Sequence, residues 1–255
     1  MNAVIPAGGI PQPDHPLYAY TKGGARALIE INGRPMLQYI VDALDTAATV
    51  DDIIVVGVPE NDHTAVTASK PLHFLPAHGS VIGNVKAGLE WIRAKRPQET
   101  EALICSADVP NIKGYMVDEL VRMCAPFEYG YYYTVATPEM IEARYPHSQR
   151  TYTKLAHGVE IAGGDVFVAQ IAMLDTSVEL WESLTHARKN AWKIARVVGL
   201  RTLLKLVTRR LSLEDAAATG SRVLGKPVKV IFVPYAELAM DADKPHQIEL
   251  LAQNC

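Results

Sequence analysis

A short apolar run that breaks into a glycine-containing loop stands at the start of the chain. Residues 3–6 have the composition of a buried strand, and the Ala7-Gly8-Gly9 turn then opens a long loop without apolar periodicity. Two glycines directly after a strand leave the backbone N–H groups open to an anion such as a triphosphate. Lys22 and Arg26 add positive charge to the same stretch. The pattern predicts an anion-binding loop, with a plain turn as the alternative.

Strand-like and helix-like segments alternate along the rest of the first half. Asp52–Val58 is a continuous apolar run, which is typical of a parallel strand covered by helices on both faces. From residue 127 onward, aromatic and alternating segments with turn glycines favour an antiparallel or mixed extension of the sheet. Strands are expected at residues 3–6, 27–31, 52–58, 72–75, 102–106 and 227–234, and helices at 35–44, 61–69, 80–95, 138–144 and within 176–213.

Composition limits the classes of protein that need to be considered. With 255 residues, of which 49% are hydrophobic and 21% charged, the chain can form one large domain with a substantial core. A formal net charge of -3 gives no electrostatic reason to expect nucleic acid as a partner. The three cysteines show no metal-binding spacing, and no apolar run approaches the roughly 20 residues of a membrane span. We expect a soluble, unprocessed cytoplasmic protein.

An aspartate follows the strand at residues 102–106 almost at once. Asp108 would therefore lie at the carboxyl end of a central strand, which is where open α/β sheets bind ligands. A carboxylate there can hold Mg²⁺ against nucleotide phosphates, because Mg²⁺ takes one or two carboxylates and fills its other positions with water and phosphate oxygens. The alternative is that Asp108 caps the helix that begins near Lys113.

Two further segments can contact ligands by their chemistry alone. Gly79 and Ser80 open the helix at residues 80–95, where free N–H groups are available, although Ser80 is also a good N-cap. Arg150 is flanked by polar residues, and its guanidinium could clamp a phosphate in a bidentate way or simply be solvated.

A basic amphipathic pattern lies in the helical region at residues 176–213. Arg201, Lys205 and Arg209 recur at helical spacing, opposite the apolar residues Leu203, Leu204, Val207 and Leu211. The simpler interpretation is a surface helix whose charged face is solvated. The other is a helix that lies on an anionic membrane surface or meets a lipid-linked substrate.

Several of these motifs together resemble one family. PAGG after the first strand, a basic residue before ALIEI, NGRPML at a helix start, the aspartate at 108 and the D-x-D-x-P-x-x-x-E ending at residues 241–249 resemble the MobA-like nucleotidyltransferases of the GT-A type. The resemblance implies a three-layer α/β/α Rossmann-like fold with a mostly parallel mixed sheet. It implies one domain over residues 1–255, with a nucleotide-binding half at 1–125 and an acceptor-binding half at 126–255 that carries a helical insertion at about 176–222.

The resemblance also assigns roles on the nucleotide side. Ala7, Gly8 and Gly9 would cradle the triphosphate, and Arg26 occupies the slot of the family lysine, with Lys22 as the nearby substitute. The residues that would contact the base or ribose are Gly79, Ser80 and Asn84.

The metal and the acceptor are assigned in the same way. Asp108 and Asp243 would hold Mg²⁺, with Asp241 in reserve, and Asp243 can also cap the last helix. Gly163-Gly164-Asp165 matches the acceptor loop, in which related transferases often carry Asn. A charged acceptor group in place of the neutral amide favours a hydroxyl-rich acceptor.

The expected activity is Mg²⁺-dependent transfer of a nucleotidyl group from an NTP to a phosphorylated small molecule, with release of pyrophosphate. One alternative is a GT-A glycosyltransferase that uses Asp241 and Asp243 on a nucleotide sugar. Another is a non-catalytic nucleotide-sensing module, because Arg26 stands where the family carries lysine and the two side chains differ in geometry and hydration. The base, the acceptor and the oligomeric state stay open.

Overall fold

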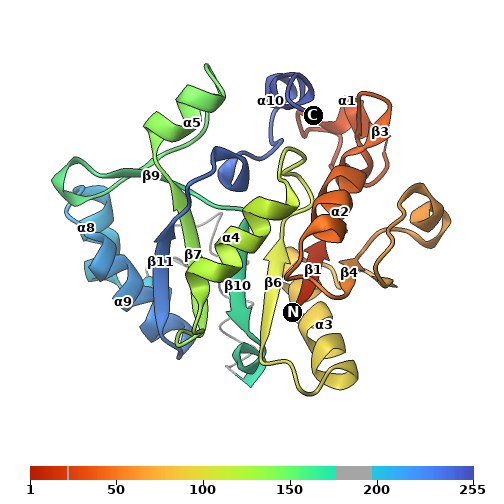
Figure 1. Ribbon diagram of the computed structural model, residues 1–255. Coiled ribbons are helices and arrows are strands. Elements are labelled where there is room, and N and C mark those ends of the chain that lie inside the picture. Colours follow the sequence, from red (N-terminus) through yellow and green to blue (C-terminus); the bar gives the residue numbers. More distant parts are fainter. Residues whose placement is uncertain (22, 176–196) are drawn as a thin grey trace.

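One mixed sheet organises the residues that the structure, a computed structural model, describes, which are 1–21, 23–175 and 197–255. Within them the sheet has nine strands in the order β5-β4-β1-β6-β10-β7-β9-β8, and β11 also pairs with β7 (Figure 1). The strands are β1 (Asn2–Pro6), β4 (Ile53–Val56), β5 (Leu72–Leu75), β6 (Glu101–Cys105), β7 (Tyr131–Ala136), β8 (Thr153–Lys154), β9 (Glu160–Gly163), β10 (Val166–Gln170) and β11 (Val228–Phe232).

The sheet is parallel in its first half and mixed in its second. β5, β4, β1 and β6 are all parallel neighbours, and β7 is parallel to β11. β10 runs antiparallel to both β6 and β7, and β9 runs antiparallel to β7. The expected mostly parallel mixed sheet is therefore confirmed.

Helices cover both faces of this sheet (Figure 1). The helices of the described residues are α1 (Tyr18–Thr21), α2 (Met36–Thr46), α3 (Val81–Lys95), α4 (Gly114–Cys124), α5 (Pro138–Arg144), α8 (Leu200–Val207), α9 (Leu213–Leu224) and α10 (Pro245–Ala252). Five 3₁₀ turns complete the described part: η1 (Arg26–Leu28), η2 (Glu60–Ala65), η3 (Ala156–Gly158), η4 (Ile171–Asp175) and η5 (Ala236–Ala239).

The side chains of β1 show how the layers form. Ala3 and Ile5 join the larger core cluster with α2 and α4, whereas Val4 joins a second cluster with α3 on the opposite face. This is the two-residue alternation of a strand whose two faces are both apolar, so a continuous apolar run is stable here. The three-layer α/β/α arrangement follows from that pattern.

Some local expectations were wrong. Residues 27–31 do not form a strand of the main sheet: η1 (Arg26–Leu28) is followed by β2 (Glu30–Ile31), which pairs with β3 (Arg34–Pro35) in a small separate hairpin. The helix expected at 61–69 shortens to η2, because Val66 is extended and buried. Most of the helix expected from residue 176, and Lys22, lie outside the described residues.

No helix in the described part of the chain is long and apolar enough to span a bilayer.

Helix α3 lies unusually close to strand β1. A Cβ atom built on Gly88 would lie 2.4 Å from Val4 Cγ1, closer than real Cβ contacts allow. Val4 is fully buried in the middle of the sheet, so neither side can give way freely. Gly88 therefore sets the distance at which α3 covers β1.

We predict that Gly88→Ala destabilises the fold by about 2 kcal/mol, because the added methyl group over-packs this contact. The matched control is Gly220→Ala in α9, where an added Cβ would be 3.4 Å from Val228 Cγ2, an ordinary contact. In this variant the higher helix propensity of alanine should stabilise the folded protein by roughly 0.5–1 kcal/mol. Urea unfolding of both variants measures the difference, and equal effects would contradict the proposed contact.

Candidate active site

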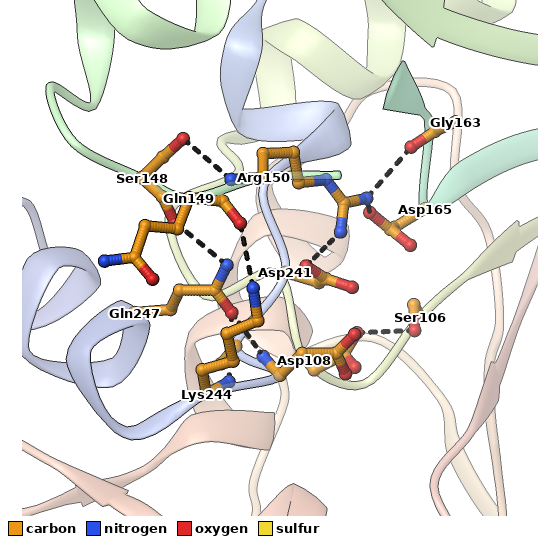
Figure 2. Close-up of polar contacts among 12 residues, drawn as sticks. Ser106, Asp108, Ser148, Gln149, Arg150, Gly163, Asp165, Asp241, Lys244 and Gln247 are labelled. Atoms are coloured by element: carbon orange, nitrogen blue, oxygen red, sulfur yellow. Dashed lines mark hydrogen bonds and ion pairs between the residues drawn. The ribbon is translucent and has the colours of Figure 1, made fainter. Parts of the chain in front are cut away.

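Four acidic side chains from distant segments meet at one edge of the sheet. Asp108 follows the carboxyl end of β6, and Asp165 directly precedes β10. Because β10 runs antiparallel to β6, with Val166 opposite Cys105, the start of one strand lies beside the end of the other. Asp241 and Asp243 come from the segment between η5 and α10. Asp108, Asp165 and Asp241 are seen together in Figure 2.

Backbone hydrogen bonds hold these segments in place. Ala242 N donates to Asp108 O at 2.9 Å, so the two flanking aspartates, 241 and 243, are fixed around Asp108. Ser106 N donates to Asp165 O at 2.8 Å, and Asp165 N donates to Leu238 O at 2.8 Å. Main-chain hydrogen bonds therefore fix the backbone positions from which these carboxylates extend.

Arg26 lies at the centre of the first group of carboxylates. Its Nη2 donates to Asp108 Oδ2 at 2.5 Å, to Asp243 Oδ1 at 2.6 Å and to Ala242 O at 3.1 Å. An Nη2 atom carries two hydrogens, so three oxygens share two donors, while the buried Nε of Arg26 has no hydrogen-bond partner. One nitrogen surrounded by three oxygens takes the place that a bound cation would fill.

The long insert after the glycine loop does not displace Arg26. Arg26 N donates to Gly9 O at 2.8 Å, which closes the loop formed by residues 10–25 at its base. The insert therefore begins and ends at the same place, and this hydrogen bond holds Arg26 beside the glycine pair although sixteen residues separate Arg26 from Gly9 in the sequence. Two cavities adjoin at Gly9 and Arg26, one of about 100 Å³ towards Asp108 and one of about 460 Å³ under the insert.

A second guanidinium organises the other carboxylates. Arg150 donates through Nη1 to Asp241 Oδ1, and through Nη2 to Asp165 Oδ2 at 3.1 Å and Gly163 O at 3.0 Å (Figure 2). Its side chain is mostly buried. Arg150 is neither solvated nor free to clamp a phosphate in a bidentate way, the two possibilities that its sequence context left open, because two carboxylates already occupy its fork.

The carboxylates carry more charge than the two arginines compensate. Four aspartates and two guanidinium groups give these six side chains a formal charge of -2. Burial and the neighbouring Asp241 and Asp108 raise the pKa of Asp165 well above its usual range. Burial, with Asp108 and Asp243 adding to it against Arg150, raises the pKa of Asp241 to about 6.

Around Arg26, attraction between opposite charges outweighs the cost of burial. Burial opposes the charge of Arg26, but Asp108 and then Asp243 outweigh it, so the pKa of Arg26 is raised. Burial likewise disfavours the charge of Asp243, yet Arg26 prevails and the pKa of Asp243 is lowered. The charges of Arg26 and Asp243 are therefore stabilised by their partners, whereas the charges of Asp165 and Asp241 are disfavoured by burial.

A divalent cation fits this donor set. Carboxylate oxygens of Asp108, Asp241 and Asp243 all lie within 4.8 Å of one another. Hard oxygen donors are the ligands that Mg²⁺ prefers, and the formal excess of two negative charges matches a divalent ion. The sequence had assigned Asp108 and Asp243 with Asp241 in reserve, and the structure brings all three together.

The glycine loop packs against the start of α3. A Cβ on Gly8 would lie 2.8 Å from Asn84 Nδ2, and a Cβ on Gly57 would lie 2.5 Å from Gly8 Cα. Asn84 also accepts from His78 N at 2.7 Å, so this buried amide ties the segment before α3 to the loop. Ala7 is buried and hydrogen-bonds to the neighbouring strand, its N donating to Val56 O at 2.8 Å.

The other predicted positions have clear local roles. Ser80 caps α3 by accepting from Gly83 N at 2.9 Å, which confirms the N-cap interpretation, and Gly79 precedes it with φ of +73°. Gly163 and Gly164 leave room for β7, since a Cβ on Gly164 would lie 2.0 Å from Thr134 Oγ1. Asp243 does not cap the last helix. Lys244 is the N-cap residue there, and Gln247 Oε1 accepts from the N–H groups of 243 and 244.

Sequence reasoning missed two contributors. Ser106 Oγ donates to Asp108 Oδ1 at 2.6 Å and fixes the orientation of that carboxylate. Gly57, with φ of +103°, lets β4 end against the glycine loop. A glycine at the end of a continuous apolar strand was the available signal for the second residue. A serine two residues before a strand-end aspartate carried no comparable signal.

Comparisons with known proteins found similar sequences and structures. Residues 19–210 match the family model of the MobA-like NTP transferase domain. A hypothetical transferase from Thermus thermophilus is 29% identical, with a TM-score of 0.81 over 97% of this chain and 100% of that chain. No curated protein matches the chain significantly.

More distant structures share the fold. The 2-C-methyl-D-erythritol 4-phosphate cytidylyltransferase from Thermus thermophilus is 17% identical, with a TM-score of 0.54 over 99% of this chain and 98% of that chain. A CMP:2-keto-3-deoxy-manno-octonic acid synthetase complexed with CTP is 14% identical, with a TM-score of 0.60 over 99% and 96% of the two chains.

We predict that Asp165→Asn stabilises the metal-free protein by about 1 kcal/mol at neutral pH. A raised carboxyl pKa means that ionisation is harder in the folded protein than in the unfolded chain, so Asp165 contributes less to stability as pH rises above about 4. The advantage of Asn should therefore grow with pH and vanish below about pH 4. Urea unfolding across this pH range measures it.

The matched control is Asp45→Asn. Hydrogen bonds from Ser69 and Lys70, against the effect of burial, lower the pKa of Asp45, so its replacement should destabilise the protein at neutral pH. If Asp165→Asn were as destabilising as the control, the charge excess that we infer at the site would be wrong.

Proposed function

We infer from the site that this chain, which belongs to the MobA-like NTP transferase family and is a nucleotidyltransferase, moves an NMP group from an NTP to a phosphorylated small molecule. An acceptor phosphate oxygen attacks the α-phosphorus, the bond to the β-phosphate breaks, and pyrophosphate leaves. The observation that carries the proposal is the meeting of Asp108, Asp241 and Asp243 around Arg26, beside a glycine-lined loop.

The nucleotide would lie along the glycine loop. Gly9 is exposed, and a Cβ added there would meet nothing within 4 Å, so the backbone leaves room for a phosphate group beside it. The adjoining cavities continue past Arg26 to Asp108 on one side and under residues 10–16 on the other. We propose that the triphosphate follows this path, and that Gly79, Ser80 and Asn84 position the base or ribose through the start of α3.

Arg26 would supply the positive charge that faces the triphosphate. Its unpartnered Nε and over-committed Nη2 indicate that a better partner is available to it than the carboxylates alone. A triphosphate presents several anionic oxygens, so Arg26 would turn to it and neutralise charge on the departing pyrophosphate. Lys22 is a second cationic residue of the same loop in the sequence.

Asp108, Asp241 and Asp243 would hold Mg²⁺. When bound, the ion would polarise the α-phosphate and orient the attacking oxygen. The chain's own residues fix the donors: Ser106 orients Asp108, Arg150 orients Asp241, and the Ala242–Asp108 backbone bond sets their separation. No general base is needed, because an acceptor phosphate is already ionised at neutral pH.

The acceptor side favours hydroxyl recognition. Arg150 is held by Asp165 and Asp241, so we assign it the task of positioning these carboxylates. Asp165 can accept from acceptor hydroxyls, and Gly163 and Gly164 keep its strand end close to β7. A polyol phosphate or sugar phosphate suits this set, and one protein of the same fold is a 2-C-methyl-D-erythritol 4-phosphate cytidylyltransferase.

The test is pyrophosphate release from the four NTPs with Mg²⁺ and a panel of sugar and polyol phosphates. We expect one NTP and one acceptor class to give turnover. Asp108→Asn should lower turnover at least about a hundredfold with the fold intact by circular dichroism, since charge stabilisation at the reacting phosphate is lost. Near-normal turnover in this variant would remove Asp108 from the site. Release of nucleoside diphosphate from nucleotide sugars, without pyrophosphate release from NTPs, would favour a glycosyltransferase.

A second prediction concerns Arg26 in the absence of nucleotide. Because its Nη2 fills the space between Asp108 and Asp243, a cation must displace it. Arg26→Ala should therefore tighten binding of Mn²⁺, used as a probe for Mg²⁺, to the free protein by about fivefold, which corresponds to the loss of one competing ion pair of about 1 kcal/mol. The same variant should lose turnover, because the charge opposite the pyrophosphate is gone.

Electron paramagnetic resonance of free Mn²⁺ measures the affinity without any reaction. The control is Arg34→Ala, which removes an arginine from an exposed pair with Asp42 and should leave Mn²⁺ binding unchanged. Weaker Mn²⁺ binding by Arg26→Ala than by wild type would show that Arg26 supports the cation and does not compete with it.

A further inference from the structure

Helix α8 (Leu200–Val207) exposes apolar side chains. Leu200, Leu204 and Val207 are 69%, 62% and 73% exposed, and their i, i+4, i+7 spacing puts them on one face of the helix. The sequence alone had left two interpretations, of which the simpler was a helix that buries its apolar face and solvates its charged one. The structure shows a solvent-facing apolar stripe, which we call the α8 stripe.

The opposite side of α8 is anchored to the body of the protein. Leu206 packs against the small core cluster formed by Val135, Leu155, Ile161 and Leu211. Lys205 Nζ donates to Asp215 Oδ2 at 2.7 Å and ties α8 to α9. The stripe is therefore exposed because the other side of α8 packs against the protein.

Positive charge surrounds the stripe. Arg201, Arg209 and Arg210 are exposed, and none of them forms an ion pair with another described residue. The described residues 197–213 contain four Lys and Arg residues and no Asp or Glu, in a chain whose formal net charge is -3. The charge is thus concentrated locally, and it is not a property of the whole surface.

We propose that the α8 stripe docks the protein on an anionic lipid bilayer. A short helix with an apolar face and flanking arginines lies in the plane of the membrane interface, with its apolar side chains among the acyl chains and its arginines at the headgroups. Three apolar side chains and the adjacent arginines complement that surface in polarity and in charge. A second copy of the chain would bring like charges together at the same face.

The docking would place the acceptor-binding half at the membrane. α8 lies with α9 at the outer edge of the molecule, beside β9 and β11 (Figure 1). Ile161, in the cluster that α8 packs on, belongs to β9, whose last residue Gly163 accepts from Arg150. The contact is peripheral and involves no spanning helix in the described part of the chain. The proposal does not depend on the identity of the nucleotide or of the acceptor.

The test is sedimentation of the full chain with vesicles of phosphatidylcholine containing phosphatidylglycerol, and with vesicles of phosphatidylcholine alone. We expect binding to the anionic vesicles at low salt, weaker binding at high salt, and little binding to the neutral ones. Absence of sedimentation with anionic vesicles at low salt would overturn the proposal.

Two double variants separate the apolar and the charged contributions. Leu204→Ser with Val207→Ser should weaken vesicle binding at least about tenfold, because buried CH₂ groups are lost from the acyl boundary. Arg209→Ala with Arg210→Ala should weaken it about thirtyfold, at roughly 1 kcal/mol for each basic residue. The matched control is Lys86→Ala with Lys95→Ala on α3, which removes the same charge elsewhere and should bind as wild type.

Each variant is checked for folding by circular dichroism and for mass by light scattering. If the control lowered vesicle binding as much as the arginine variant did, the attraction would be non-specific, and the α8 site would be wrong. Wild type could instead be a dimer in light scattering, and the serine variant a monomer with unchanged vesicle binding. That result would make the stripe a contact between copies and would overturn the proposal.

Discussion

The site depends on the balance between four carboxylates, of which only that of Asp243 is exposed, and two guanidinium groups. Carboxylates so close together repel one another, and burial adds to the cost of their charge. Arg26 and Arg150 reduce that cost by pairing with two aspartates each, at 2.5 and 2.6 Å in the case of Arg26. The two arginines therefore offset part of the electrostatic cost of bringing together the ends of β6 and β10 and the segment before α10, whose backbones are joined by hydrogen bonds.

Main-chain hydrogen bonds position the segments that carry the acidic groups. The bond between Gly9 and Arg26 closes the Pro-rich insert at its base, and the bond between Ala242 and Asp108 joins the C-terminal segment to β6. The backbone bond between Gly9 and Arg26 explains how an unusually long first loop is compatible with the motifs that surround it.

How far the sequence could predict the site depends on how each residue reaches it. Asp108 was predictable because a strand-end aspartate needs only local information, and the motif at 241–249 supplied the C-terminal pair. The pairing of Arg150 with Asp165 and Asp241 could not be predicted, because it depends on the antiparallel position of β10 between β6 and β7. Strand order is a property of long-range packing. The orientation of α8 was open for the same reason, since leucines occur on several sides of that helix.

The charge balance also links the ligands to each other. As long as Arg26 Nη2 fills the space between Asp108 and Asp243, the acidic cluster is partly neutralised by the protein itself. On the proposed function, a triphosphate on the glycine loop would offer Arg26 other anionic oxygens and so make its replacement by a divalent cation easier. The cation and the nucleotide would then favour each other's binding through one side chain, a coupling that needs no movement of the sheet. We therefore propose for Arg26 the role of a counter-ion that is exchanged.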